Sequence, residues 1–485
     1  MLSWKGSGKS VSLNLFDKNS LNCQKHLFTI IKFAVSLKNS SCLASHFFMS
    51  YENEYRTGGR GGRGRGRGNR VRGQYGPQPP SPPPKDFESN WTEEIDDFDN
   101  MNLNQDLLHG IFSYGFKNPS VIQSLAIKPI IMGRHLIAQA QSGTGKTGAF
   151  SIGILQSIDT SQRTTQALIL SPTRELATQT YIFLTGIGNR MKDLSVALFI
   201  GGSQVYEDQE VAKNLPHIIV ATPGRSLSLI KEGFLRCENL GIVCVDEADQ
   251  MLSGGFIEQI QEIFSFFNPN IQILLFSATF SNDVYELMKQ FMTDPVKILV
   301  KSEQLTLEGI TQYYVNVSEF KYKFPTLLDI YGQLSIQKGI IFANSKQTVD
   351  YLQKEFTKEK FEVSAIHAGL LQEERAKTMQ QFRTGSTRVL VSTDLLARGI
   401  DVQQVTLVIN FELPNSVEQY LHRIGRSGRY GRKGVAINIV ESSEMDQIKI
   451  LQDHYKTTIH ELPNNFAEVV KEANQSVSEN EQNAK

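Results

Sequence analysis

The sequence predicts an α/β protein with two tandem, doubly wound parallel-sheet domains that are joined by a short linker and preceded by a disordered N-terminal tail. Short apolar stretches alternate with helix-length segments, which is the pattern of parallel strands connected by crossover helices. The alternation stops around Val300–Gly309 and then begins again, which indicates a second domain of the same class. Residues 56–72 consist mainly of arginine and glycine, so they cannot bury enough apolar surface to fold.

The strands are expected at the apolar stretches. In the first domain, residues 96–300, these are His135–Ala140, Gln166–Leu170, Val196–Ile200, Ile218–Ala221, Ile242–Val245 and Ile271–Phe276. In the second domain, residues 310–463, they are Gly339–Phe342, Glu362–Ile366, Arg388–Val391, Thr406–Asn410 and Val435–Ile439. Residues 301–309 are expected to form the linker and residues 464–485 a polar tail.

The chain before the first domain is expected to contribute no domain of its own. Residues 49–95 form a tail with an RGG part and a proline-rich part, because arginines lie among glycines and six prolines follow between Pro77 and Pro84. Residues 1–48 contain lysines but no arginine, so a mitochondrial presequence is the less favoured interpretation. We expect translation to start at Met49, which would make residues 1–48 an artefact of the gene model.

The composition excludes several classes of protein. Hydrophobic residues make up 40% of the 485-residue chain, charged residues make up 21%, and the formal net charge is +0, as in many globular proteins. No apolar run reaches the length of a membrane span. The cysteine spacings match neither a zinc site nor a disulfide framework. The arginines of the tail indicate binding of single-stranded RNA, with a solubilising role as the alternative.

A phosphate-binding loop is expected after the first strand. Its glycines allow backbone N–H groups to close around phosphates, its lysine contacts the outer phosphates, and its threonine hydroxyl can bind Mg²⁺. A second glycine-rich segment, Gly6–Ser10, has Ser3 where the pattern needs glycine and no expected strand before it, so we do not expect it to bind phosphate. The residues of the expected loop are Ala140, Gln141, Ser142, Gly143, Thr144, Gly145, Lys146 and Thr147.

Two adjacent carboxylates, Asp246 and Glu247, follow the apolar stretch Ile242–Val245. Doubly wound sheets bind ligands at the carboxyl ends of their strands, so these side chains are expected beside the phosphate loop. An acidic pair after a strand is more often a helix cap, but a phosphate loop in the same domain reverses that preference. Asp246 is expected to hold Mg²⁺ together with Thr147, and Glu247 to orient or deprotonate the attacking water.

Arginines at three-residue spacing mark the second domain, at Arg423, Arg426 and Arg429. The simpler interpretation is a solvated basic helix face. The second domain has no phosphate loop of its own, however, and hydrolysis of ATP requires neutralisation of charge in the transition state. We therefore expect Arg423 and Arg426 to act on ATP bound between the domains, so that hydrolysis depends on domain closure.

The segment Asp246-Glu247-Ala248-Asp249 spells the signature of a known family. From Phe98 to Pro463 the chain resembles the DEAD-box RNA helicases, whose motifs occur here in order. The resemblance implies two RecA-like domains, ATP and Mg²⁺ as cofactors, and RNA bound by its backbone with little sequence preference. Within the family, the chain is similar to the branch of the translation initiation factors and to their exon-junction sister.

The same resemblance assigns roles to short motifs. Gln123 is expected to contact adenine by hydrogen bonds and Phe116 by stacking, with Asn118 in the same motif and Phe98 as upstream support. Asp394 is expected near the ribose, and Ser277-Ala278-Thr279 resembles the motif that couples the nucleotide state to RNA. The residues expected to contact RNA are Pro172, Thr173, Arg174, Gly201, Gly202, Thr222, Pro223, Gly224, Arg225, Thr393 and Arg398.

These assignments predict RNA-stimulated ATP hydrolysis that drives local unwinding of RNA duplexes in translation initiation. The alternative is an ATP-gated RNA clamp in an mRNA-processing or exon-junction-type complex, and a DNA helicase is a distant third. We expect a monomer that binds other initiation-factor or mRNA-complex proteins and no membrane. The cytoplasm is the expected location, with the nucleus as the alternative. Departures from the relatives, such as Gln250 and His367-Ala368-Gly369, leave the protein partners open.

Overall fold

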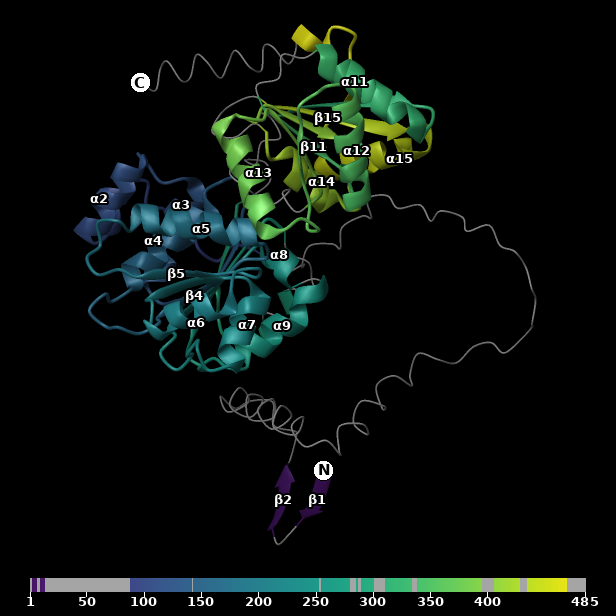
Figure 1. Cartoon of the computed structure of the whole chain (residues 1–485). Coiled ribbons are helices and arrows are strands. Elements are labelled where there is room, and N and C mark those ends of the chain that lie inside the picture. The colour runs from purple at the N-terminus through teal and green to yellow at the C-terminus, as the bar shows by residue number, and fades with distance from the viewer. Residues whose placement is uncertain are drawn as a thin grey trace. The chain divides into compact units, whose positions relative to one another are not determined.

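The computed structural model describes most of the chain from residue 88 to residue 468 (Figure 1). Near the N-terminus it also describes the backbone of residues 2–6 and 9–13. The expected RGG tail, the linker, the end of the polar tail, Ser142 and Arg398 lie outside the described residues. The segments left out within the main part are residues 142, 253, 280–284, 287–288, 301–309, 334–337, 395–404 and 428–433.

The first domain contains a seven-stranded sheet in which every pairing is parallel. The strand order is β5-β6-β4-β7-β8-β3-β9, with the reversal of direction that defines a doubly wound sheet. Six of the strands confirm the expected ones, and the edge strand β9 was not expected. The strands are β3 (Leu136–Gln139), β4 (Ala167–Leu170), β5 (Val196–Phe199), β6 (Ile218–Ala221), β7 (Ile242–Asp246), β8 (Gln272–Ser277) and β9 (Val296–Leu299).

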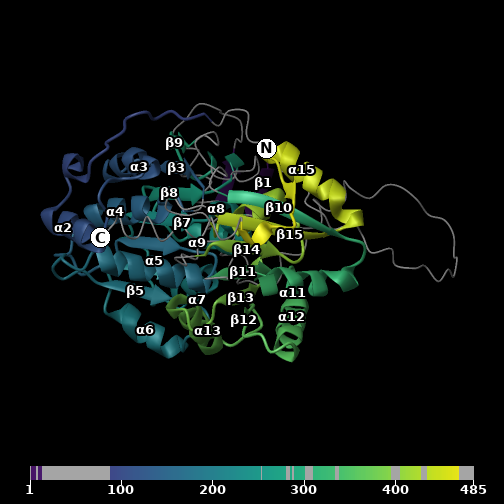
Figure 2. The same cartoon turned by 90° about the horizontal axis from the view of Figure 1, so that it is seen from above.

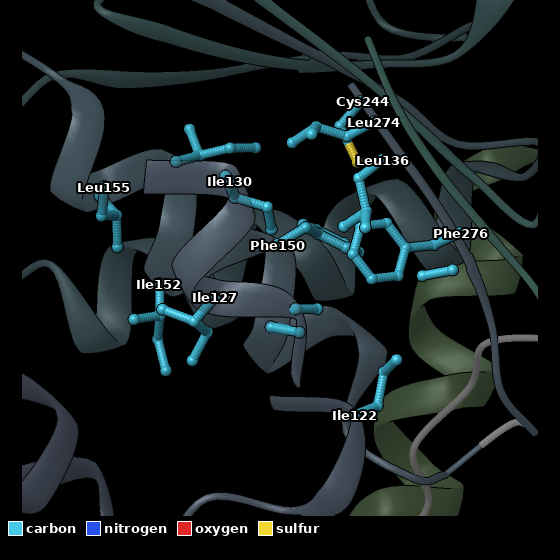
Figure 3. Packing of buried hydrophobic residues seen from close by; sticks show 14 of the residues in the cluster. Ile122, Ile127, Ile130, Leu136, Phe150, Ile152, Leu155, Cys244, Leu274 and Phe276 are labelled. Atoms are coloured by element: carbon cyan, nitrogen blue, oxygen red, sulfur yellow. The ribbon is translucent and has the colours of Figure 1, made fainter. Parts of the chain in front are cut away.

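Helices cover both faces of this sheet, with α4 and α5 on one face and α6 and α7 on the other (Figure 1). The core lies between the sheet and α3 and α4, where the rings of Phe150 and Phe276 pack with centroids 5.3 Å apart (Figure 3). The helices are η1 (Phe98–Met101), α2 (Gln105–Tyr114), α3 (Val121–Ile131), α4 (Lys146–Ser157), α5 (Arg174–Ile187), α6 (Val205–Lys213), α7 (Pro223–Lys231), α8 (Ala248–Met251), η2 (Gly254–Phe256) and α9 (Ile257–Phe264).

The second domain repeats this plan with a second seven-stranded parallel sheet, in the order β12-β13-β11-β14-β15-β10-β16. The fold class expected from the sequence is therefore confirmed. Strand β10 was not expected, because polar residues interrupt its apolar ones, and β16 was not expected, because it consists of only two residues, both polar. The strands are β10 (Ile310–Val317), β11 (Gly339–Phe342), β12 (Ser364–Ile366), β13 (Val389–Ser392), β14 (Leu407–Asn410), β15 (Gly434–Glu441) and β16 (His460–Glu461).

The two faces of the second sheet are covered by different helices, with α11 and α12 on one side and α15 on the other (Figure 2). Helix α14 packs with α15, because Tyr420 and Leu451 belong to the same buried cluster. The helices are η5 (Phe320–Tyr322), α11 (Lys323–Gln333), α12 (Lys346–Lys358), α13 (Gln372–Thr384), α14 (Val417–Ile424), η7 (Ser442–Glu444) and α15 (Met445–Tyr455).

The packed part of each domain extends beyond the boundary expected from the sequence. Trp91 and Ile95 pack against the core of the first domain, before residue 96. Phe466 is buried in the core of the second domain, beyond Pro463. Isolated apolar residues in polar surroundings, as these are, give no periodic signal that would assign them to a domain.

The N-terminal residues form an antiparallel hairpin of β1 (Leu2–Gly6) and β2 (Lys9–Leu13), with Gly6 opposite Lys9. The expectation that no strand precedes the segment Gly6–Ser10 is therefore wrong. The chain continues from this segment into a second strand and not into a helix, so no helix N-terminus is available for phosphate. Among the described residues, no helix is long and apolar enough to cross a membrane.

Candidate nucleotide and RNA site

The loop after β3 has the geometry of a phosphate-binding loop. Gly143 and Gly145 have φ angles of +88° and +104°, in the left-handed region that favours glycine, and α4 begins directly afterwards at Lys146. The hydroxyl of Thr144 donates to the carbonyl oxygen of Gln141 at 2.8 Å and closes the turn. A strand, a glycine turn and a helix N-terminus in this order place backbone N–H groups around an anion. Of the expected loop residues, Ala140 is buried, and Thr147 is half-buried at the start of α4.

Two opposite charges are buried beside this loop without hydrogen-bond partners. Nζ of Lys146 lies 3.8 Å from Oε2 of Glu247, and both side chains are buried. Neither of these atoms has a hydrogen-bond partner among the described residues. A buried ammonium and a buried carboxylate are stable only when their hydrogen-bonding groups are satisfied. The arrangement therefore fits a nucleoside triphosphate. Its phosphate oxygens would accept hydrogen bonds from Lys146, and the attacking water would donate a hydrogen bond to Glu247.

Asp246 ends β7 and lies in the same buried group. One of its carboxylate oxygens accepts a hydrogen bond from the backbone N–H of Glu247 at 2.9 Å. Burial, and then the neighbouring charge of Glu247, raise the pKa of Asp246 to about 7, against the opposing effect of Lys146. A divalent cation would offset this repulsion between carboxylates, so Asp246 and Thr147 fit Mg²⁺, which phosphate loops bind through a Ser or Thr hydroxyl.

Glu247 has a φ of +50°, a left-handed conformation that is rare for a residue other than glycine. This conformation separates the end of β7 from the start of α8 and turns the glutamate toward Lys146. Backbone strain at a side chain that is both charged and buried is typical of functional sites. The structure therefore places Glu247 beside Lys146, and its role in orienting the attacking water stays a prediction.

Asp249 connects the acidic segment to β8 and to the second domain. Its backbone N–H donates to the Ser277 hydroxyl at 3.1 Å, and the Thr279 hydroxyl donates to its carboxylate at 3.1 Å. Nε2 of His422, on α14, lies 3.5 Å from the same carboxylate. Atoms of Glu247, Asp249 and His422 lie within 4.8 Å of one another, a spacing that a cation could bridge. Asp249 and His422 were not among the expected site residues, because each contact joins segments far apart in the sequence.

Gln123 links the expected adenine segment to the phosphate loop. Its side-chain oxygen accepts from the backbone N–H of Ser120 at 2.9 Å, and its amide nitrogen donates to the carbonyl oxygen of Gly145 at 3.1 Å. A Cβ on Gly145 would lie 2.6 Å from that amide nitrogen, and one on Gly148 would lie 2.4 Å from it. A side chain at either position would therefore displace the Gln123 amide from its place beside the loop. Contact of Gln123 with adenine stays a prediction.

The aromatic residues expected near adenine form one cluster. Phe98 is fully buried and packs edge-on against Phe116, with ring centroids 6.2 Å apart. Phe116 is half-buried and stacks on Tyr114 with an interplanar angle of 22°. The buried ring of Phe98 thus contacts Phe116, and its role as upstream support for adenine binding stays a prediction. Asn118 is exposed beside this cluster, and stacking of adenine on Phe116 stays a prediction.

The segments of the first domain expected to bind RNA follow three adjacent strands, β4, β6 and β5. Thr173 caps α5 by accepting a hydrogen bond from the backbone N–H of Leu176, so Pro172, Thr173 and Arg174 lie at the helix start. The hydroxyl of Thr222 accepts from the backbone N–H of Gly201 at 3.3 Å and joins two of the segments. Because the carboxyl ends of parallel strands lie at one edge, the three segments form a single surface.

Arg225 follows one of these segments, but its guanidinium is engaged by groups of the protein itself. Its guanidinium forms a buried ion pair with Asp208 and donates to the carbonyl oxygen of Ser203 at 2.9 Å. The Ser203 hydroxyl also donates to Asp208 at 3.0 Å. The expectation that Arg225 contacts RNA is therefore not supported. Arg225 instead fixes the segment that follows Gly202, where φ is +90°.

Residues of α5 contact α13 of the second domain. Glu175 and Arg375 form an ion pair at 2.5 Å, and both side chains are buried. The Arg174 guanidinium donates to the side-chain oxygen of Gln372 at 3.1 Å. Gln372 and Arg375 were not expected in the site, because α13 has charged residues on most of its surface and suggests a solvated helix.

Arg423 was expected to contact ATP, and the structure does not support this. The side chain is fully buried, and all of its N–H groups donate within the second domain. Nε and one terminal nitrogen bind both carboxylate oxygens of Asp394, at 2.6 and 2.9 Å. Asp394, expected near the ribose, is therefore held by Arg423. Half-buried Thr393 precedes it, and buried Arg426 donates from Nε to the carbonyl oxygen of His422 at 3.1 Å.

Comparison with families of known proteins gives two matches in the chain. The family of the DEAD/DEAH box helicases matches residues 120–287, and the helicase conserved C-terminal domain matches residues 322–431. The chain is 52% identical over 384 residues to eukaryotic initiation factor 4A of Drosophila melanogaster, covering 79% of this chain and 95% of the relative. It is 48% identical over 388 residues to the ATP-dependent RNA helicase eIF4A of Pyricularia oryzae, covering 80% and 98%.

Solved structures with the same fold carry RNA and nucleotide. The structure is similar to that of Dbp5 from S. cerevisiae bound to RNA and ADP BeF3, with a TM-score of 0.74, 33% identity, and coverage of 79% of this chain and all of the other. It is also similar to Mss116p bound to ssRNA and AMP-PNP, with a TM-score of 0.69, 28% identity, and coverage of 79% and 83%.

Proposed function

The chain belongs to the DEAD-box family of ATP-dependent RNA helicases, and from this premise we propose that it unwinds RNA duplexes locally during translation initiation. The pair of Lys146 and Glu247 is the observation that supports ATP hydrolysis most directly, because both charges are buried and lack hydrogen-bond partners among the described residues. The proposed step in translation rests on relatives that are named as initiation factors and cover most of both chains.

In the proposed reaction, each acidic or basic residue beside the phosphate loop has one task. Lys146 holds the outer phosphates, and Glu247 accepts a hydrogen bond from the attacking water and orients it for in-line attack. Thr147 and Asp246 would hold Mg²⁺, which supplies positive charge to the phosphate oxygens. Burial of these side chains strengthens each electrostatic interaction, because the local dielectric constant is low.

Arg426 is the arginine that we assign to the transition state. Arg423 has every donor engaged elsewhere, whereas Arg426 lies three residues further along the same segment, past the end of α14. A guanidinium from the second domain would neutralise the charge that develops on the transferred phosphoryl group. Hydrolysis would then require both domains, which explains how RNA bound to both can control it.

RNA is proposed to bind at the carboxyl edges of both sheets. On the first domain this surface is formed by the segments of Thr173, Gly202 and Thr222, which offer backbone N–H groups and hydroxyls rather than base-reading side chains. Such groups recognise phosphates and sugars, so affinity would depend little on base sequence. Protein partners, Mg²⁺ binding and action in the cytoplasm belong to the same proposal and follow from the role as an initiation factor.

The experiment that tests the proposal measures ATPase activity and duplex unwinding of the purified full chain, with and without RNA. We expect hydrolysis to rise in the presence of RNA and short RNA duplexes to separate in the presence of ATP. Addition of the chain to a translation extract depleted of its own initiation helicase should restore translation. If the chain does not restore translation, and if it releases RNA only after partner proteins are removed, the ATP-gated clamp is favoured instead.

A further inference from the structure

A row of polar side chains crosses the buried face of the second sheet beneath α14. In β15, Val435, Ile437 and Ile439 belong to the cluster with α11 and α12, so alternation places Asn438 on the opposite face. Asn410 of β14 is the register partner of Asn438 on the neighbouring strand. Gln312 of β10 lies on the same face, and these three side chains are at most 2% exposed.

The row is joined by hydrogen bonds that all run in one direction. A terminal nitrogen of Arg423 donates to Asn410 at 3.3 Å, and the Asn410 amide donates to Asn438 at 2.8 Å. The Asn438 amide donates to the Tyr420 hydroxyl at 3.1 Å, which in turn donates to Gln312 at 2.9 Å. Hydrogen bonds that follow one another in this way polarise and strengthen each other.

The side chains in the row have few hydrogen-bonding groups left over. The Asn438 amide makes its second donation to the carbonyl oxygen of Tyr313 at 2.9 Å, so both of its N–H bonds are used. Burial raises the pKa of the Tyr420 hydroxyl, so it remains a donor throughout the ordinary pH range. A network with nearly all its groups satisfied is stable in a core, whereas the loss of one member leaves its neighbours unpaired.

The row ends at loops that carry site residues. Besides Asn410 and the carboxylate of Asp394, Arg423 donates to the side chain of Asn344 at 2.6 Å and to the carbonyl oxygen of Glu412 at 2.7 Å. Asn344 follows β11, and Asp394 follows β13. Arg423 therefore connects α14 to loops at the carboxyl ends of β11, β13 and β14, and the polar row connects it to β15 and β10.

Apolar side chains would fill this face at lower cost, because a buried polar group contributes only when its partners are placed correctly. The polar row instead fixes the position of α14 along the sheet. Val417 and Ile424 of α14 are buried by apolar contact, which tolerates small shifts of a helix along a sheet. Tyr420 and Arg423 do not tolerate such shifts, because each must meet named atoms on β14 and β15.

We propose that Tyr420, Asn438 and Asn410 are positioning residues for ATP hydrolysis, which set α14 on the sheet through Arg423 and thereby place Arg426. This inference rests on the proposed role of Arg426 at the transition state. None of the three positioning residues touches the nucleotide. Their effect is expected on the rate of the hydrolysis step and not on the binding of ATP, because binding to the phosphate loop needs only the first domain.

The test compares two variants of the full chain in which one phenol oxygen is removed. Tyr420→Phe interrupts the row. Tyr455→Phe is the matched control, because the Tyr455 hydroxyl also bonds to α14, donating to the carbonyl oxygen of Val417 at 2.6 Å, but lies outside the row. For each variant, kcat and KM for ATP at saturating RNA are measured together with the thermal unfolding temperature.

We expect Tyr420→Phe to lower kcat about tenfold with KM for ATP changed less than about twofold. Tyr455→Phe should lower the unfolding temperature by a similar amount, yet keep kcat within about twofold of the wild type. Equal effects of the two variants on kcat would overturn the proposal, because the row would then contribute only to stability.

A double-mutant cycle checks whether the row acts through Arg423. Once Arg423→Lys has removed the planar guanidinium, Tyr420→Phe should lower kcat by less than about twofold further, whereas the effects of Tyr455→Phe and Arg423→Lys should multiply. If the effects of Tyr420→Phe and Arg423→Lys on kcat multiply, the row does not act through Arg423 and the proposal is overturned. The assignment of Arg426 is tested separately by Arg426→Ala. An undiminished kcat in that variant would remove the proposed function of Arg426, whereas the coupling between Tyr420 and Arg423 would still stand as measured.

Discussion

The first and second domains use buried charge in opposite ways. Around the phosphate loop, Lys146 and Glu247 are buried with atoms that have no hydrogen-bond partner among the described residues. In the second domain, Arg423 is equally buried, yet all of its N–H groups are engaged by Asp394, Asn344, Asn410 and Glu412. The charges beside the phosphate loop are placed to bind a ligand, whereas Arg423 stabilises the second domain. Both sets nevertheless consist of charged residues in sequence motifs of the same family.

The difference teaches that burial of a charge does not reveal its task. An unsatisfied buried charge is unfavourable in the free protein and becomes favourable when substrate supplies the missing partner. A satisfied one gains nothing from substrate but is hard to replace, because its removal leaves several partners unpaired. Substitutions in the two domains should therefore separate activity from stability.

The largest effect on activity is expected from Lys146→Ala. Loss of the ammonium removes the contact with the outer phosphates, so hydrolysis should fall to the background rate. Stability in the absence of nucleotide should fall less than in the Arg423 variant below, since Nζ donates no hydrogen bond among the described residues and only its 3.8 Å ion pair with Glu247 is lost. ATPase assays and chemical denaturation measure the two quantities. A loss of stability as large as that of the Arg423 variant below would contradict the contrast between the domains.

The largest effect on stability is expected from Arg423→Met. This change leaves the Asp394 carboxylate and the side chains of Asn344 and Asn410 without their donor. Removing one partner from a buried ion pair lowers the free energy of unfolding by about 3–5 kcal/mol. Urea denaturation measures this free energy from the unfolding transition of the second domain. A change below about 1 kcal/mol would show that the network can rearrange around the gap.

An intermediate effect is expected at the contact between α5 and α13. Arg375→Gln removes the charge that pairs with buried Glu175, while each domain keeps its own core. ATP binding should persist, but RNA-stimulated hydrolysis should fall by about tenfold, because closure of the domains loses a contact of about 1.4 kcal/mol. The matched control is Arg383→Gln, on the exposed last turn of the same helix, which should leave the rate unchanged. Equal rates for both variants would remove this contact from the mechanism.

The smallest effect is expected from Arg225→Lys. The lysine keeps the charge beside Asp208 but cannot also donate to the carbonyl oxygen of Ser203. The segment after Gly202 should become less well positioned, so RNA affinity should fall by about three- to tenfold with kcat at saturating RNA unchanged. Titration of RNA in the ATPase assay gives both numbers. A drop of a hundredfold or more would instead indicate direct contact between Arg225 and RNA.

The sequence predicted the strands and the phosphate loop well because these depend on local pattern. Apolar stretches such as Ile218–Ala221 became strands with the same bounds, and Lys146 begins the helix after a glycine turn. Strand β10 was missed because Gln312 interrupts its apolar face, and the buried Gln312 accepts a hydrogen bond from Tyr420, which lies far away in the sequence. A residue whose partner is distant carries no local signal.

The same reason explains the assignments that changed in the site. Arg423 and Arg426 have the same residue type and lie on one face by spacing, so the sequence could not distinguish the structural arginine from the one proposed to act on ATP. Arg225 belongs to a motif that binds RNA in the resembling family, yet its own guanidinium is engaged by Asp208. Motifs identify a segment, whereas the three-dimensional partners of each side chain decide what that side chain does.

Glu247→Gln tests the central claim most directly, because it changes one atom of the unsatisfied pair and keeps its shape. Hydrolysis is measured at saturating ATP and RNA, and binding of labelled RNA is measured in the same mixture. We expect hydrolysis to fall by about a hundredfold or more while ATP and RNA stay bound together, since only the alignment of the attacking water is lost. Hydrolysis at the wild-type rate would contradict the assignment of Glu247 and, with it, the interpretation of the buried pair as an ATP site.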